Sequence, residues 1–151
     1  GLARLPGLGL LFELQVFADQ MEGAAALARA LPDVQFVLMH AGMLEDLSAA
    51  GRTAWRKGLA RLAACPNVAT KISALGTFVH AVDPPLVTEV TAVATDLFGP
   101  GRCCWGSNFP IEKLWTGYRR LLDAHLAALA RLPAADRQAV LHDTAARLYR
   151  L

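Results

Sequence analysis

Residues 102–110 have the sequence RCCWGSNFP, and this stretch decides the fold. Its short apolar run is typical of a buried strand, which we predict over residues 102–107. Asn108 and Pro110 favour a tight turn directly after it. The stretch therefore predicts a buried strand whose end carries polar side chains.

Three more strands precede this one, and we predict them at residues 11–17, 34–39 and 68–73. We predict helices at residues 21–31, 46–64, 83–98, 116–131 and 134–150. In the second of these helices, Trp55, Leu59 and Leu62 recur at intervals of three and four, as on the buried face of an amphipathic helix. The alternation of strands and helices favours a parallel sheet that crossover helices cover.

Four consecutive strand–helix units fit either a doubly wound sheet or half of an eight-stranded barrel. A nucleotide-binding sheet needs a glycine-rich loop after a strand, but Gly7-Leu8-Gly9 precedes the first strand instead. This favours the barrel. We therefore predict an α/β fold with a single partial barrel domain over residues 1–151.

The composition is that of a globular domain, because 54% of the 151 residues are hydrophobic and the net charge is only +2. No basic run supports nucleic-acid binding. The apolar stretches end well short of the roughly 20 residues that a membrane span needs. Cys65, Cys103 and Cys104 form no CxxC pattern. We expect buried free thiols in a reducing compartment, the cytoplasm.

Polar residues stand where the predicted strands end. They are Gln20, His40, Lys71 with Ser73, and Ser107 with Asn108. In parallel α/β folds the reactive groups gather at the carboxyl ends of the strands. The sequence therefore predicts that these side chains converge on one rim, where they form a site.

Each candidate residue has a functional and a structural interpretation. His40 either binds a metal or transfers protons, or it bonds a loop carbonyl. Asn108 either orients a substrate or fixes the turn with Ser107. Lys71 either binds an anionic substrate group or extends to solvent. Trp115 either lines the cleft or covers the last helix, whereas we expect surface or structural roles for His80, His125 and His142.

Four blocks of sequence, in this order and spacing, resemble the amidohydrolase-related (amidohydrolase 2) family. The blocks span residues 12–16, 36–43, 66–73 and 102–110, and residues 145–149 also match the last helix of the family. The resemblance implies a TIM-barrel metal-dependent hydrolase similar to lactonases. By this resemblance the chain supplies the C-terminal half of the (β/α)₈ barrel, strands five to eight.

The resemblance also implies roles for two residues. His40 matches a histidine of strand six that contributes to the metal or substrate site. Asn108 falls where many relatives carry an aspartate that binds the metal and activates water, and an asparagine cannot take that proton. The full-length parent is expected to hold a divalent metal such as zinc, or none. The histidine pair of strand one has no counterpart here, so residues 1–151 alone should bind metal weakly or not at all.

The function that follows is hydrolysis of a lactone or related cyclic ester of a carboxylic acid by water activated at the barrel mouth. In this view Lys71 takes a substrate carboxylate. Gln20, Ser73, Ser107 and Trp115 complete the binding site for a small acidic or lactone substrate.

Two alternatives stay open. The first is an inactive half-barrel, either a truncated gene product or a module that pairs with a second copy through its open sheet edges. The other alternative is a decarboxylase.

Overall fold

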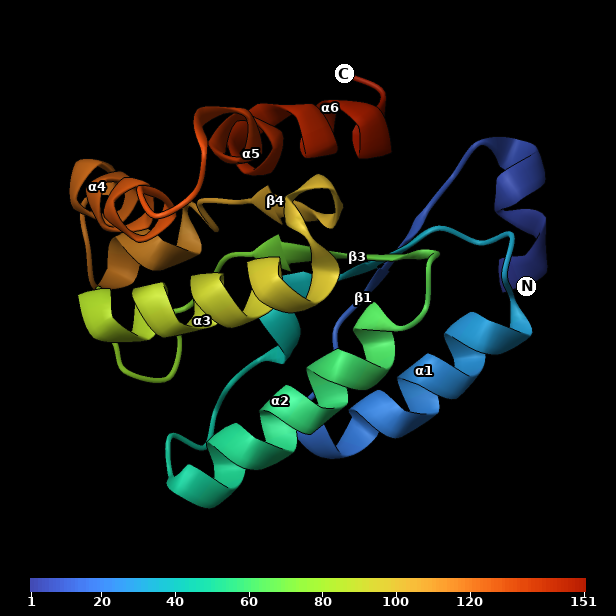
Figure 1. Cartoon of the computed structure of the whole chain (residues 1–151), viewed down its shortest axis with the longest axis horizontal. Coiled ribbons are helices and arrows are strands. Elements are labelled where there is room, and N and C mark those ends of the chain that lie inside the picture. The colour runs from blue at the N-terminus through green and yellow to red at the C-terminus, as the bar shows by residue number, and fades with distance from the viewer. The chain divides into compact units, whose positions relative to one another are not determined.

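Four short parallel strands form the sheet of the computed structural model, which describes all residues 1–151 (Figure 1). The strands are β1 (Phe12–Leu14), β2 (Phe36–Leu38), β3 (Val68–Ile72) and β4 (Cys103–Trp105), and they neighbour one another in that order. Neighbouring parallel strands require crossover connections, which the helices provide. The prediction of an α/β fold with parallel strands is therefore confirmed.

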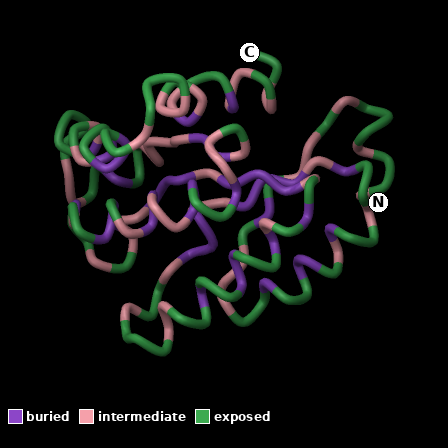
Figure 2. Tube along the Cα trace, in the orientation of Figure 1, coloured by how far each residue is buried: buried purple, intermediate pink, exposed green.

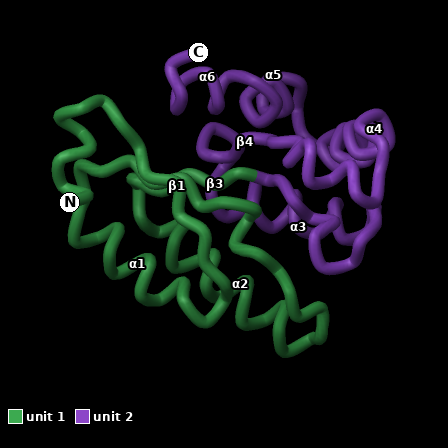
Figure 3. Tube along the Cα trace, turned by 180° about the vertical axis from the view of Figure 1, so that it is seen from behind, with its two compact units in different colours: residues 1–71 green, residues 72–151 purple.

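The chain divides into two compact units, residues 1–71 and residues 72–151 (Figure 3). The boundary falls inside β3, between Lys71 and Ile72.

The first unit places two helices beside its strands. Helices α1 (Met21–Ala30) and α2 (Ala49–Ala63) lie against each other (Figure 1). Short helical turns connect the larger elements: η1 (Leu2–Arg4), η2 (Pro6–Leu8), η3 (Ala18–Gln20) and η4 (Met39–Gly42). The register pairs Glu13 with Val37 and Val37 with Ala69. These three residues therefore share one face of the sheet.

The core of the first unit includes β2 and one face of α2. All three residues of β2 are completely buried. Along the helices, buried residues alternate with exposed ones (Figure 2). Trp55, Leu59 and Leu62 are also completely buried, which confirms the predicted apolar stripe. Burial of each such side chain contributes roughly 1.5–3 kcal/mol to folding.

Helix α2 begins three residues later than the sequence predicts. The Ser48 hydroxyl accepts a hydrogen bond from the Gly51 amide at 3.1 Å, which makes Ser48 the N-cap. The Asp46 carboxylate accepts one from the Ser48 amide at 2.8 Å. Asp46 therefore belongs to the turn before the helix.

The second unit contains the remaining helices. They are α3 (Pro84–Phe98), η5 (Pro100–Arg102), η6 (Ile111–Leu114), α4 (Tyr118–Leu129), α5 (Ala134–Gln138), η7 (Ala139–Asp143) and α6 (Thr144–Tyr149). Asp83 caps α3 by accepting a hydrogen bond from the Leu86 amide at 3.2 Å, as its position before two prolines predicts. Helix α3 packs against α4.

Other predicted segments also differ from those observed. The first strand ends at Leu14 and not at residue 17, because the Phe17 amide bonds the Gln20 side chain at the start of η3. The helix predicted at 134–150 is interrupted by η7, a π-helical turn that packs against β4.

All three cysteines are buried free thiols, as expected. Burial raises the pKa of the Cys103 thiol, and the neighbouring Cys104 raises it further. The Cys103 thiol is therefore not a ready nucleophile. No helix has both the length and the apolar character that crossing a membrane would require.

Candidate functional site

The chain that follows β2 adopts an unusual backbone conformation. His40, Ala41 and Met43 have φ values of 56°, 47° and 51°, and Gly42 between them has 74°. A residue with a β-carbon pays about 1–2 kcal/mol in this left-handed region. Such strain persists only where the surroundings impose it, and it is common at functional sites.

Buried contacts hold this segment in place. The Trp55 indole of α2 donates a hydrogen bond to the Ala41 carbonyl at 2.8 Å. A β-carbon on Gly42 would meet the flexible thioether end of Met21, and the φ of 74° would strain any residue other than glycine. The position of His40 at the end of β2 is therefore fixed by the core of the first unit.

His40 is half-buried beside two charged side chains. Burial lowers the pKa of the imidazole below 6.5, and the positive charge of Lys71 lowers it further, whereas Glu13 partly opposes them. His40 is consequently neutral at pH 7. The neutral imidazole is the form that accepts a proton or binds a metal.

Lys71 forms an ion pair with Glu13, whose Oε1 lies 2.7 Å from the lysine Nζ. Lys71 stands two residues beyond Ala69 in β3, so the register places it on the sheet face that carries Glu13. The lysine side chain is 19% exposed and the glutamate 41%. The structure thus gives Lys71 a carboxylate partner within the protein.

Gln20 and Ser73 occupy different surroundings. Gln20 is exposed, and its Oε1 accepts a hydrogen bond from the Phe17 amide at 3.0 Å. Ser73 is only 1% exposed. Their assignment to substrate binding stays a prediction.

In the second unit, the loop after β4 gathers three of the predicted residues. We call residues 106–116 the β4 loop. Asn108 has a φ of 54°, and the Ser107 hydroxyl accepts a hydrogen bond from the Phe109 amide at 3.3 Å. The Asn108 Nδ2 donates to Glu112 Oε1 at 3.4 Å, and the Trp115 Nε1 donates to Glu112 Oε2 at 2.6 Å.

Glu112, which joins Asn108 to Trp115, was not singled out from the sequence. It is completely buried, whereas Ile111 and Leu114 in the same turn are 51% and 78% exposed. This reverses the usual pattern of apolar residues inside and acids outside. The available signal was the spacing: Glu112 lies four residues after Asn108 and three before Trp115, which is helical spacing.

The loop after β3 packs onto the same cluster. A β-carbon on Gly76 would lie 2.5 Å from the Trp115 Nε1 and 2.7 Å from the Glu112 Oε2. The His80 ring stacks on the Trp115 indole, with 5.4 Å between ring centroids. Glycine at position 76 therefore permits the close approach of the two loops.

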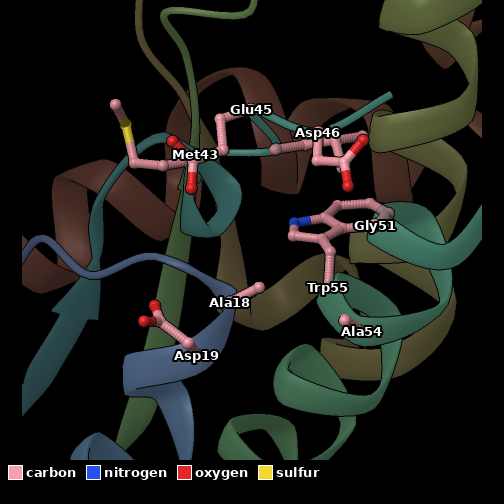
Figure 4. A pocket seen from close by; sticks show the side chains of 9 residues that line it. Ala18, Asp19, Met43, Glu45, Asp46, Gly51, Ala54 and Trp55 are labelled. Carbon is pink, nitrogen blue, oxygen red and sulfur yellow. The ribbon is translucent and has the colours of Figure 1, made fainter. Parts of the chain in front are cut away.

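A pocket of about 250 Å³ opens in the first unit (Figure 4). Its lining residues are Ala18, Asp19, Met43, Leu44, Glu45, Asp46, Gly51, Ala54 and Trp55. They come from η3 after β1, from the segment after β2, and from the start of α2. The pocket lies at the carboxyl ends of two strands, although none of the predicted site residues lines it.

The residues of this chain do not form a metal site by themselves. A tight zinc site uses three or four protein ligands. No three His, Cys, Asp or Glu side chains of the chain are grouped closely enough to hold a metal ion. His40 would supply at most one ligand.

Comparison with known sequences identifies the family. The amidohydrolase family model matches residues 1–151. The L-fucono-1,5-lactonase of Burkholderia multivorans is 32% identical over 162 residues, which cover 100% of this chain and 55% of the lactonase. The uncharacterized protein y4mH of Sinorhizobium fredii is 37% identical over 155 residues, which cover 100% of this chain and 50% of that protein.

Comparison with solved structures agrees. A Burkholderia multivorans amidohydrolase with bound zinc superposes with a TM-score of 0.91 at 29% identity. The match covers 99% of this chain and 56% of that one. The chain thus spans about half the length of its relatives and corresponds to half of an amidohydrolase TIM barrel, as predicted. It belongs to the amidohydrolase family.

Proposed function

We propose that the protein to which this chain belongs hydrolyses a lactone, and that the strand ends of this chain contribute to the site. Membership of the amidohydrolase family supports hydrolysis. The lactonase names of two relatives, 32% and 36% identical, support a cyclic ester as the substrate. The complete reaction is proposed for the whole protein and not for residues 1–151 alone.

The single observation that carries the proposal is the state of His40. A strained backbone places the imidazole at the end of β2, and burial together with Lys71 keeps it neutral near pH 7. A neutral imidazole can accept a proton from an attacking water. We assign this role to His40.

The proposed reaction consumes only the lactone and one water molecule. The water oxygen bonds to the lactone carbonyl carbon while His40 takes one water proton. The ring bond between that carbon and the ester oxygen then breaks. The proton passes from His40 to the departing oxygen, which becomes the hydroxyl group of the hydroxy-acid product.

The ion pair of Lys71 with Glu13 bears on the choice of substrate. A lysine already compensated at 2.7 Å attracts a substrate carboxylate less than an isolated cation would. This favours an uncharged lactone, such as that of a sugar acid, over one that carries a carboxylate. Ser107 and Asn108 suit such a substrate because they offer neutral hydrogen-bonding groups.

Amidohydrolases generally depend on a divalent metal, and a relative has been crystallised with zinc. The side chains of this chain do not complete such a site, so the roles assigned above concern protons and hydrogen bonds. None of the contacts described favours decarboxylation. Hydrolysis is therefore the function proposed.

The test compares lactone hydrolysis by the unmodified protein and by His40→Gln. Loss of the proton acceptor should lower kcat by about 10²–10⁴-fold. The control, His142→Gln, removes an exposed histidine and should keep full activity. Sugar-acid lactones and carboxylate-bearing lactones form the two substrate arms. Full activity of His40→Gln, or no turnover of either lactone class, contradicts the proposal.

A further inference from the structure

Glu112 is a buried acid without a basic partner. Its side chain is completely buried, and its only side-chain partners are the neutral donors of Asn108 and Trp115. Burial of a carboxylate without a cation costs several kcal/mol that neutral hydrogen bonds only partly offset. The same short turn leaves the apolar residues Ile111 and Leu114 exposed while it buries Glu112. The burial of Glu112 is therefore not explained by packing of the hydrophobic core.

Backbone contacts bring Glu112 and Asn108 together. The Asn108 carbonyl accepts a hydrogen bond from the Glu112 amide at 3.2 Å, and the Glu112 carbonyl accepts one from the Thr116 amide at 3.0 Å. The two side chains are therefore held on one side of a tight turn. Their mutual orientation follows from the chain path.

The carboxylate decides which end of the Asn108 amide faces it. The Asn108 Nδ2 donates to the Glu112 Oε1 at 3.4 Å, so the Nδ2 points toward Glu112 and the Oδ1, on the other side of the amide, points away from it. The Oδ1 makes no hydrogen bond within the chain. An outward Oδ1 is an acceptor, and its natural partner is an O–H group of a substrate or of water.

We propose that Glu112 is a positioning residue that locks the Asn108 amide with its Oδ1 outward, so that the β4 loop recognises a hydroxyl donor. Trp115, bonded to the second carboxylate oxygen at 2.6 Å, keeps Glu112 in place. The catalytic part of this proposal rests on the lactone hydrolysis proposed above. The orientation of the amide does not.

The substitution Glu112→Gln tests this role because it should reverse the orientation of the Asn108 amide. The glutamine oxygen can still accept from Trp115, whereas the glutamine amide now faces Asn108. The Asn108 amide should then turn over and direct its Oδ1 inward, which satisfies every hydrogen bond. We expect the urea midpoint of unfolding to stay near that of the unmodified protein. Activity, measured as kcat/KM, should fall about tenfold or more because the outward acceptor is lost.

A second substitution should restore the acceptor. In the double variant Asn108→Asp/Glu112→Gln, the new carboxylate at position 108 accepts from the glutamine amide and offers its other oxygen outward. We expect kcat/KM to recover relative to Glu112→Gln alone. By contrast, Asn108→Asp alone sets two carboxyl groups about a hydrogen bond apart with no amide donor between them, and kcat/KM should fall.

Nuclear magnetic resonance separates this proposal from the proposed function. The side-chain amide signals of Asn108 should move in Glu112→Gln and stay in place in the control Asp123→Asn, which alters an exposed acid of α4. If no lactone is hydrolysed but these signals move, the lactonase proposal fails and the positioning role stands. Unmoved signals or a large fall in the urea midpoint of Glu112→Gln overturns the role of Glu112. Where the unmodified protein does hydrolyse a lactone, no recovery of kcat/KM in the double variant overturns it as well.

Discussion

His125 on α4 gives the protein a pH-dependent stability that can be calculated. The side chain is 1% exposed, its Nε2 has no hydrogen-bond partner, and its ring lies edge-on to Trp105 with 5.9 Å between centroids. Burial lowers the pKa of His125 to about 4. In the unfolded chain the pKa returns to about 6.5.

The sign of the pH dependence follows from whether the folded or the unfolded chain binds the proton at the higher pH. Because the unfolded chain takes up the proton at higher pH than the folded one, the stability is fully present above pH 6.5 and is lost as the pH falls toward 4. The complete difference is about 3 kcal/mol, and about 2 kcal/mol of it is lost between pH 7.5 and pH 5.

The assay is urea unfolding at pH 7.5 and pH 5 for the unmodified protein and for His125→Phe. Between the two pH values, the free energy of unfolding of the unmodified protein should fall by about 2 kcal/mol more than that of the variant. Other groups, such as His40 and Asp143, titrate in both proteins, so their contributions to the pH dependence cancel in the comparison. His142→Phe, at an exposed position, is the control and should follow the unmodified protein. Parallel pH dependences of the unmodified protein and His125→Phe, or a titration of His125 near pH 6.5 by nuclear magnetic resonance, would refute the reasoning.

Three further predictions concern the loops and the metal. Gly76→Ala places a β-carbon 2.5 Å from the Trp115 indole nitrogen and should lower the free energy of unfolding, measured by urea titration, by about 1–3 kcal/mol. The control Gly117→Ala places a β-carbon with no atom within 4 Å and should change that free energy by less than about 0.5 kcal/mol. Ser48→Ala removes the N-cap of α2 and should cost about 1 kcal/mol in thermal or urea unfolding; no loss would mean that water replaces the cap. Residues 1–151 should bind zinc weakly or not at all in calorimetry, and stoichiometric tight binding would contradict this.

The order of elements could be predicted from the sequence because apolar runs, prolines and turn residues act locally. For the same reason the ends of the strands could be located to within three residues, and with them His40 and Asn108. The pairing of Lys71 with Glu13 could not, because the two residues are 58 positions apart and meet only through the register of three strands. A pattern of apolar residues also says little about which face of the sheet a charged residue lies on.

Glu112 was missed for a different reason. Local rules place acids on the surface and isoleucine inside, and the turn that contains Glu112 breaks both. Such reversals are expected where function outweighs stability. The left-handed backbone at His40 is similar, since a histidine between methionine and alanine carries no turn signal.

The backbone after β2 also makes this segment a place where stability and the role proposed for His40 are opposed. Glycine adopts left-handed φ values freely, so Ala41→Gly should release about 1 kcal/mol of conformational strain, less the entropy that glycine adds to the unfolded chain. The strain retained at positions 40, 41 and 43 marks the segment as one to leave untouched when the protein is engineered for heat resistance, with stabilising substitutions directed to the helices instead.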